Sequence, residues 1–332
     1  MRSCSPTEAS EELEVNGKAG INTMMWGPPG SGKSDIVYDY GVRIGAKIYE
    51  LRANLFDPVD VRGGLKVVEQ KDGSYRTRYG VPEDYPPSDY TGLVLLFIEE
   101  LPNAPKATMN ALLQLLLSGR IGTYSLPINT IIVAAGNRAS DRAAVHEMPT
   151  PVKNRFAHIE LEPTVDDFCK WGVNNGIDES ITSFIRYRPK LLHAMDATEN
   201  AFPTPRTWAM LSKKLPFIKN MFTGCASIIG DGPAGEYIAY RSIYKEVPDV
   251  LDIIKKPSTV KVPTEASALF ATAGTVANAA DQTTFKAIMK YVNRMPKEYQ
   301  VVAVKDSLAK DLSLQSHDSL TKWTEENADI LM

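Results

Sequence analysis

The chain contains 332 residues, of which 43% are hydrophobic and 23% are charged, and it carries a formal net charge of −3. This composition is typical of a soluble globular protein with room for two domains, and the charge gives no global attraction to nucleic acid or anionic lipid. No apolar run approaches the roughly 18 residues of a membrane span, and three widely spaced cysteines (Cys4, Cys169 and Cys225) fit no metal-binding pattern. We therefore expect a cytoplasmic protein with reduced thiols.

The order of apolar and polar segments predicts an α/β domain followed by a helical one. Residues 1–20 are polar and lack the apolar core of a signal peptide, so we expect a frayed lead-in. From 21 to 162, short apolar runs alternate with helical patterns, as in domains with a parallel sheet. From 163 to 332 the pattern is helical, which predicts a second domain. The five expected strands lie at 21–27, 46–52, 93–98, 130–136 and 157–161.

Two β-hairpins are expected within the α/β domain. Residues 65–80 form two strand-like arms around Lys71-Asp72-Gly73, a turn signal, and residues 119–129 suggest a second, shorter hairpin. Hairpins inserted in a parallel domain usually project from it, so both are candidate contact elements. Plain surface decoration fits the same pattern equally well.

A phosphate-binding loop is the strongest motif in the sequence. Residues 27–34 read GPPGSGKS, which fits GxxxxGK[ST], and they lie between an expected strand and an expected helix. Backbone N–H groups of such a loop surround phosphate oxygens at a helix N-terminus. The lysine would reach the β- and γ-phosphates, and the final serine would bind Mg²⁺. The loop consists of Gly27, Pro28, Pro29, Gly30, Ser31, Gly32, Lys33 and Ser34.

Two acids follow the apolar strand 93–98. Alone, Glu99 and Glu100 are weak evidence, because buried strands often end in solvated acids. Beside a phosphate-binding loop, however, an oxygen ligand for Mg²⁺ and a base that orients the attacking water are both needed. Glu99 suits the metal and Glu100 the base. A glutamate instead of an aspartate at the metal position leaves the rate of hydrolysis open.

Three further polar residues stand next to expected strands or helices. Asn137 ends the strand 130–136 and could orient the water or contact the γ-phosphate, although a turn-forming asparagine would look the same. Arg155 precedes the strand 157–161, and Arg206 begins a helix. Most arginines are solvated surface residues, and the local sequence alone assigns these two no other role.

Taken together, the motifs resemble those of MoxR-type AAA+ ATPases, in particular the MoxR-like ATPases of bacteria and phages. The resemblance extends over nearly the whole chain from Gly20. Its motifs occur in the expected order, and the later segments GPAGEY and VPTEASALFATAG resemble the C-terminal part of that group. The motifs from Asp57 to Trp208 are DPVDVRGG, EELPNAP, AAGNRASDRA, NRF and FPTPRTW.

The resemblance implies an AAA+ P-loop core with a five-stranded parallel sheet and inserted hairpins, a C-terminal helical lid, and Mg-ATP bound between them. It also implies a homo-oligomeric ring, usually a hexamer, with ATP at subunit interfaces. Asn137 resembles sensor one and Arg206 resembles sensor two. Arg155 resembles the arginine finger that acts on a neighbour's nucleotide, with Arg138 and Arg142 as rival candidates. The hairpin at 65–80 resembles an insert that in relatives faces the ring pore or a substrate.

Three functional hypotheses follow. The leading one is an ATP-hydrolysing machine that remodels or activates a partner protein, because MoxR relatives often work with a von Willebrand factor A domain protein. A nucleic-acid motor is an alternative, supported by basic hairpin residues that nearby acids dilute. A nucleotide-gated scaffold that barely hydrolyses ATP is the third, motivated by Glu99. The basic residues are Lys66, Lys71, Arg76 and Arg78, and the acids are Glu69 and Asp72.

Overall fold

The computed structural model describes residues 3–121, 123–138, 141, 146–196, 198–244 and 247–327. The chain divides into two compact units, Met1–Glu162 and Pro163–Met332, called unit 1 and unit 2 below. Arg142, one of the rival interface arginines, lies outside the described residues. Within the described part of the chain, no helix has both the length and the apolar character needed to cross a membrane.

Unit 1 is built on a parallel sheet of six strands in the order β1-β10-β2-β9-β6-β3. Five of these strands are the ones expected from the sequence. The fold class, an α/β core with inserted hairpins and a helical part after it, is thereby confirmed, with one strand more than the five expected. The strands are β1 (Ser3–Cys4), β2 (Thr23–Trp26), β3 (Lys47–Arg52), β6 (Val94–Glu99), β9 (Thr130–Gly136) and β10 (Ala157–Leu161).

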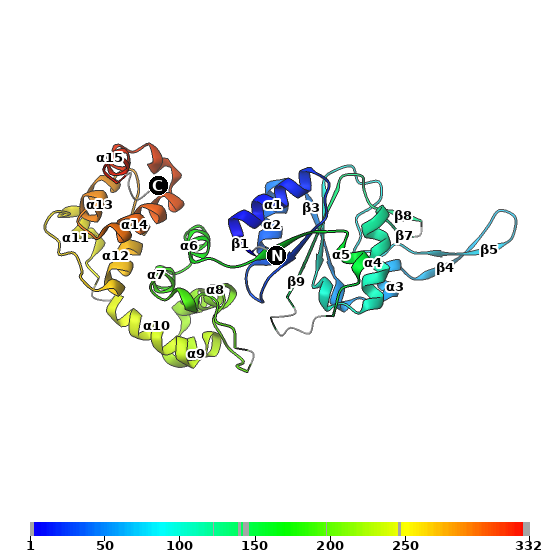
Figure 1. The fold of residues 1–332 in the computed structure, drawn as a ribbon, viewed down its shortest axis with the longest axis horizontal. Coiled ribbons are helices and arrows are strands. Elements are labelled where there is room, and N and C mark those ends of the chain that lie inside the picture. Colours follow the sequence, from blue (N-terminus) through cyan, green and yellow to red (C-terminus); the bar gives the residue numbers. More distant parts are fainter. Residues whose placement is uncertain are drawn as a thin grey trace. The chain divides into compact units, whose positions relative to one another are not determined.

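Helices cover both faces of this sheet, which is why its central strands are apolar throughout. In β6, successive side chains point to opposite faces: Leu95 and Phe97 join one core, and Leu96 and Ile98 join the other. Figure 1 shows α1 and α2 on one side of the sheet and α4 on the other. The helices of unit 1 are α1 (Pro6–Lys18), α2 (Lys33–Arg43), α3 (Pro58–Arg62), α4 (Lys106–Ser118) and α5 (Thr150–Lys153), with short 3₁₀ turns η1 (Ala53–Leu55) and η2 (Leu101–Asn103).

The expectation of a frayed lead-in is wrong. Ser3 and Cys4 form the edge strand β1 beside β10, and α1 follows them. Ser5 begins this helix with a capping box, in which Ser5 and Glu8 bond to each other's backbone N–H groups. Ala9 and Leu13, four residues apart, are buried in the core on the α2 side of the sheet. The serine–proline–x–glutamate start was the signal for this helix.

Both expected hairpins are present. β4 (Leu65–Glu69) pairs with β5 (Tyr75–Tyr79), and this ribbon extends away from the sheet (Figure 1). Its register places Leu65, Val67 and Tyr75 on one face, where all three are exposed, and Lys66, Arg76 and Arg78 on the other. The short pair β7 (Arg120–Ile121) and β8 (Tyr124–Ser125) follows α4. The long hairpin therefore has an apolar face and a basic face.

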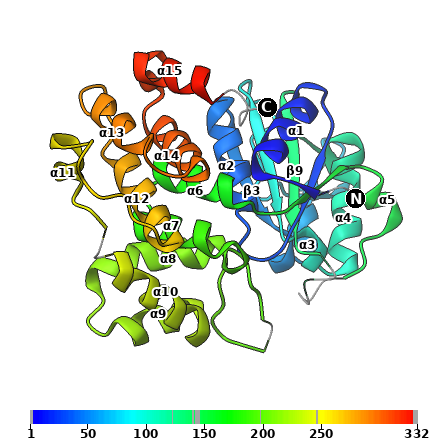
Figure 2. The same ribbon diagram turned by 60° about the vertical axis from the view of Figure 1, so that its left-hand side comes forward.

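The described part of unit 2 is helical and packs around two apolar clusters, one formed by its earlier helices and one by its later helices. Helix α12 packs against both α7 and α14, as Figure 2 shows. A buried ion pair joins Arg186 of α7 to Asp306 of α14. The helices are α6 (Val165–Asn174), α7 (Glu179–Tyr187), α8 (Pro205–Lys214), α9 (Met221–Ile229), α10 (Asp231–Tyr244), α11 (Val250–Lys255), α12 (Ala266–Asn278), α13 (Phe285–Val292), α14 (Lys297–Lys310) and α15 (Asp318–Glu326), with 3₁₀ turns η4 (Pro189–Leu191), η5 (Leu215–Phe217) and η6 (Leu312–Ser316).

If α1 belongs to the core of unit 1, truncating its buried leucine should destabilise the protein. Leu13 is 1% exposed, so we expect Leu13→Ala to lower the free energy of unfolding by about 2–5 kcal/mol. Val15, on the same helix, is 59% exposed, and Val15→Ala should change the free energy of unfolding by less than about 0.5 kcal/mol. Urea unfolding followed by circular dichroism measures both, and equal effects would contradict the packing described for α1.

Candidate functional site

The loop at residues 27–32 connects β2 to α2 at the carboxyl edge of the sheet. Gly30 and Gly32 have φ angles of 73° and 92°, in the left-handed region that glycine adopts without strain. Gly32 is the N-cap of α2, so the first N–H groups of that helix lie at the loop. The helix dipole at this end favours an anion. The hydroxyl of Ser31, in the same loop, is buried and has no hydrogen-bond partner among the described residues.

Lys33 links this loop to the end of a neighbouring strand. Its ammonium donates to the carbonyl oxygens of Gly27 at 2.8 Å and Pro28 at 3.0 Å, and to Oδ1 of Asn137 at 3.0 Å. Lys33 and Asn137 are each 9% exposed. Asn137 follows β9, which pairs with β2 in parallel, so the two strand ends meet at the same edge. The structure thus brings together two predicted site residues that are 104 positions apart in the sequence.

Ser34 contacts the acid at the end of β6. Its hydroxyl donates to Oε1 of Glu99 at 2.5 Å, and the two side chains are partly buried. A hydroxyl and a carboxylate are hard oxygen ligands of the kind that Mg²⁺ prefers. Among the described residues, no group of three or more His, Cys, Asp or Glu side chains could hold a metal. Such a cage is not needed, since Mg²⁺ on a nucleotide usually takes one or two protein ligands besides phosphate oxygens and water.

Three residues that the sequence analysis did not single out surround Glu99. Nε of Arg52 lies 3.6 Å from Oε2 of Glu99 and 2.5 Å from Oε1 of Glu50. The hydroxyl of Tyr38, on α2, donates to the other carboxylate oxygen of Glu50. Glu50 and Arg52 are two positions apart on β3, which lies beside β6. In the sequence, Glu50 and Arg52 are only a pair of opposite charges at the end of an expected strand. Their position beside Glu99 follows from the pairing of that strand with β6.

The charges of this group are stabilised at neutral pH. Burial and the hydrogen bond to Glu50 raise the pKa of Tyr38 to about 12. Although burial alone would raise it, the pKa of Glu50 lies below its ordinary value, because Tyr38 and Arg52 donate to its carboxylate. The same carboxylate, together with Glu99, raises the pKa of Arg52. Glu50 therefore stays ionised, while Tyr38 and Arg52 keep their protons.

Glu100 adopts an unusual backbone conformation. Its φ of 55° and ψ of 32° place it in the left-handed region, and it is the one residue other than glycine with a positive φ in the described part of the chain. Such a conformation costs on the order of 1–3 kcal/mol and occurs often at active sites. Packing supports it, because η2 follows directly and Pro102 lies against Gly136 of β9. A Cβ on Gly136 would lie 2.2 Å from Cδ of Pro102.

The two candidates for an interface arginine that the structure describes, Arg138 and Arg155, differ sharply. Arg138, next to Asn137, bonds to Asp141 and reaches Glu160 of β10 at 2.8 Å. The pKa of Arg138 is raised, mainly by its hydrogen bond to Asp141 and further by its hydrogen bond to Glu160, although burial alone would lower it. Arg155 is exposed, and its side chain has no hydrogen bond or ion pair with any residue that the structure describes. Of the two, Arg155 has its charge available for another molecule.

Arg155 lies at the opposite edge of the sheet from the loop of its own chain. It precedes β10, whose first residue, Ala157, pairs with Thr23 at the start of β2. The loop follows Trp26 at the other end of β2, roughly 10 Å further along at about 3.3 Å per residue. Arg206, the remaining predicted residue, belongs to unit 2, where it is exposed on the first turn of α8.

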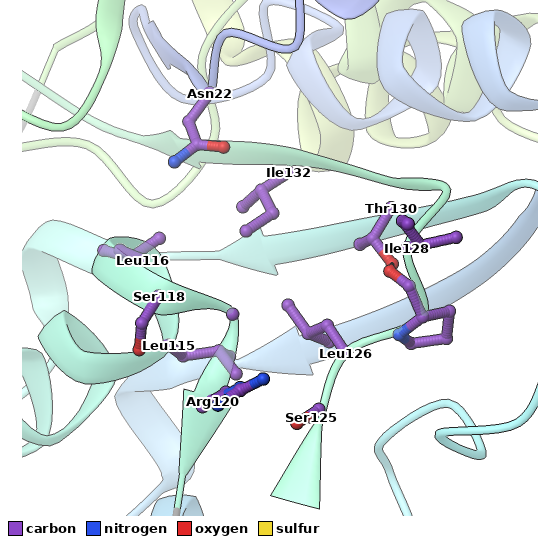
Figure 3. Close-up of a pocket in the computed structure, with 12 residues that line it drawn as sticks. Asn22, Leu115, Leu116, Ser118, Arg120, Ser125, Leu126, Ile128, Thr130 and Ile132 are labelled. Atoms are coloured by element: carbon purple, nitrogen blue, oxygen red, sulfur yellow. Dashed lines mark hydrogen bonds between the residues drawn. The ribbon is translucent and has the colours of Figure 1, made fainter.

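A cavity of about 370 Å³ lies away from these residues, between the end of α4, the β7–β8 hairpin and β9 (Figure 3). Asn22, just before β2, and Thr130, at the start of β9, lie on its wall, so it belongs to the amino edge of the sheet. Lys33, Glu99 and Asn137 occupy the carboxyl edge. The cavity is therefore separate from the candidate nucleotide site.

Comparison with known proteins gives a family match over part of the chain and solved structures of low similarity. Residues 8–149 match a family model described as the MoxR domain in the MoxR-vWA-beta-propeller ternary systems. None of the curated proteins matches the chain. RuvB of Thermotoga maritima, described as a Holliday junction branch migration motor, is 17% identical, with a TM-score of 0.41 and coverage of 87% of this chain and 86% of that one.

NtrX of Brucella abortus has been solved with ADP and with ATP. The ADP complex is 12% identical, with a TM-score of 0.42 and coverage of 96% of this chain and 67% of that one. The ATP complex is 11% identical, with a TM-score of 0.42 and coverage of 97% of this chain and 67% of that one. At such scores these similarities say nothing about function.

The family match spans the loop at residues 27–34 together with Glu99, Glu100 and Asn137, and it ends before Arg155 and Arg206. It agrees with the fold of unit 1, in which a parallel sheet presents that loop and the ends of β6 and β9 at one edge. Residues 8–149 of this chain therefore match the MoxR domain of these ternary systems.

Proposed function

We propose that unit 1 binds Mg-ATP at the loop of residues 27–34 and hydrolyses it. The observation that carries the proposal is the pair of contacts Lys33–Asn137 and Ser34–Glu99, which bring a phosphate-binding loop, an acid and a strand-end amide to one edge of the sheet. The buried hydroxyl of Ser31, which has no hydrogen-bond partner among the described residues, and the positive end of the α2 dipole fit an anion there.

In this proposal each site residue of unit 1 has a role. Lys33 would turn from the loop carbonyls to the β- and γ-phosphates, and Ser34 and Glu99 would hold Mg²⁺. When bound, the metal would neutralise charge on the phosphate oxygens. Glu100 would accept a proton from the attacking water, and Asn137 would hold that water or the γ-phosphate. For Arg206, on α8 of unit 2, we propose the sensor-two role that the sequence resemblance implies.

We further infer that the active form is a homo-oligomeric ring, with hexamers as the expected size. Arg155 is exposed, lacks a partner among the described residues and lies at the edge opposite its own loop. A second copy that placed its loop against this edge would receive the guanidinium at its own phosphates. An arginine supplied in this way accelerates phosphoryl transfer about 10³- to 10⁵-fold.

The work of the ATPase is proposed to be the remodelling of a partner protein. The matched family is described from systems that combine a MoxR domain with a vWA protein and a β-propeller, so a vWA-domain protein is the partner that we propose. The β4–β5 hairpin offers it a surface, because Leu65, Val67 and Tyr75 are 66%, 69% and 68% exposed on one face. Affinity purification with and without ATP, followed by mass spectrometry, tests this: a vWA protein retained only with ATP supports the proposal.

A nucleic-acid motor remains the alternative, since the register gathers Lys66, Arg76 and Arg78 on the other face of the hairpin. Three exposed cations along one ribbon could follow a phosphate backbone. This function requires that DNA or RNA stimulate ATP turnover, that added salt weaken the stimulation, and that Arg76→Ala with Arg78→Ala abolish it. Turnover that nucleic acid leaves unchanged would exclude the alternative.

Replacing the proposed base should separate binding from hydrolysis. We expect Glu100→Gln to lower the rate of ATP turnover at least about 100-fold, because the amide accepts no proton, while Mg-ATP binding stays within a factor of two. Glu83→Gln, an exposed acid elsewhere in unit 1, is the matched control and should leave both unchanged. Phosphate release and a fluorescent nucleotide titration measure the two quantities. Equal turnover in Glu100→Gln and the parent would favour a nucleotide-gated scaffold.

Removing the proposed interface arginine should slow a neighbouring subunit. Arg155→Ala should bind ATP normally but turn it over about 10³-fold more slowly, and it should inhibit mixed rings beyond its mole fraction. Specific activity of the parent should also rise with protein concentration as rings form. Arg120→Ala, another exposed arginine of unit 1, is the control. Normal turnover by Arg155→Ala would mean that another residue supplies the charge.

A further inference from the structure

Glu99 is held from two sides. Its Oε1 accepts the hydrogen bond from Ser34 at 2.5 Å, and its Oε2 lies 3.6 Å from Nε of Arg52. The second distance is that of an ion pair and is too long for a hydrogen bond. Arg52 and Glu99 are direct neighbours in the pairing of β3 with β6, so the sheet itself keeps the two side chains together.

Arg52 is in turn fixed by residues that lead back to α2. Glu50 accepts from Nε of Arg52 at 2.5 Å, and its other oxygen accepts from the hydroxyl of Tyr38. Tyr38 and Ser34 are four residues apart and lie on the same face of α2. Contacts therefore run in a closed circuit from Ser34 through Glu99, Arg52, Glu50 and Tyr38 to the same helix.

The charges explain why such a circuit is needed. Glu50 and Glu99 are two partly buried acids, with side chains 24% and 22% exposed, and Arg52 is the cation paired with both. A glutamate has one more rotatable bond than an aspartate, so its carboxylate needs an external partner to keep one position. An ion pair on Oε2 restricts the side chain while Oε1 remains with Ser34.

We propose that Arg52 is a positioning residue that, held by Glu50 and Tyr38, fixes the carboxylate of Glu99 against Ser34 and thereby sets the affinity of the site for Mg²⁺. The inference rests on the proposed function and extends it to three residues outside the phosphate-binding loop. It also accounts for the glutamate at position 99, because the longer side chain allows one carboxylate to contact Ser34 of α2 and Arg52 of β3 at once.

The test is a Mg²⁺ titration of nucleotide binding by the full chain, with a fluorescent ATP analogue as the probe. Loss of a residue that orients a metal ligand typically lowers metal affinity 10- to 100-fold, so Arg52→Gln should raise the Mg²⁺ midpoint about 10-fold. Arg52→Lys keeps the charge and should recover part of this shift. Binding of the analogue in EDTA should stay within a factor of two in all variants.

A double-mutant cycle with Glu99→Asp gives a readout that a purely structural role would not move. The carboxylate of the shorter aspartate lies about 1.5 Å nearer the backbone and loses contact with Arg52. In the Glu99→Asp background, Arg52→Gln should therefore raise the Mg²⁺ midpoint by less than about twofold. Arg43→Gln is the matched control: Arg43 lies on α2 with an exposed pair to Glu14, and its loss should leave the Mg²⁺ midpoint unchanged.

The outcomes separate the two proposals. If the parent chain binds no nucleotide at any Mg²⁺ concentration, the proposed function is overturned and the role of Arg52 with it. The role of Arg52 alone is overturned if the parent binds nucleotide and Arg52→Gln has the same Mg²⁺ midpoint as the parent. It is also overturned if the effects of Arg52→Gln and Glu99→Asp on that midpoint are additive. If Arg52→Gln weakens binding equally with and without Mg²⁺, it acts on the fold of the loop, and the positioning role is also overturned.

Discussion

The ammonium of Lys33 lies almost out of contact with water, and the rest of the site follows from how it is held. A buried charge is costly unless polar groups surround it, and here two loop carbonyls and the amide oxygen of Asn137 do so. The carbonyls come from a turn that glycine at residue 32 makes possible. The amide comes from a strand more than a hundred residues away, which only the parallel pairing of β2 with β9 brings alongside.

That pairing also fixes the neighbouring strand, and with it the acids. β6 lies on the far side of β9, in register with it, so Glu99 emerges at the same edge and meets Ser34 at the start of α2. One residue later the chain must turn into η2, and it does so through the strained backbone of Glu100. The turn fits because Gly136 has no side chain where Pro102 packs. The residue that we propose as the catalytic base and a glycine on the adjacent strand are thus parts of one packing arrangement.

The sequence was sufficient for those features that a local pattern encodes. Apolar runs located five strands of the sheet, the turn at residues 71–73 located the long hairpin, and GPPGSGKS located the loop between β2 and α2. The lead-in was misjudged because its mean polarity was considered instead of its cap and the spacing of Ala9 and Leu13. The edge strand β1 could not be foreseen, since two residues gain strand structure only by pairing with β10.

Features that depend on which strands are neighbours were beyond the sequence. The contact of Arg52 with Glu99 requires the order of β3 and β6 and their register, and neither is written in any local motif. The same holds for the choice among interface arginines. The sequence resemblance favoured Arg155 and left Arg138 and Arg142 as rivals. The fold pairs Arg138 with Asp141 and Glu160 and leaves Arg155 exposed. Only tertiary structure distinguishes an arginine that completes its own domain from one that remains available.

The long hairpin has a consequence for the energy of unit 1. A ribbon of two strands with both faces in water has no core of its own, and isolated ribbons of this kind are marginally stable. Its backbone pairs should therefore open far more often than those of the central sheet, at little cost to the remainder of the domain. A partner that covers either face would supply the burial that the ribbon lacks. Binding of a partner to the β4–β5 hairpin should therefore slow amide exchange in the hairpin, even where exchange in the central sheet does not change.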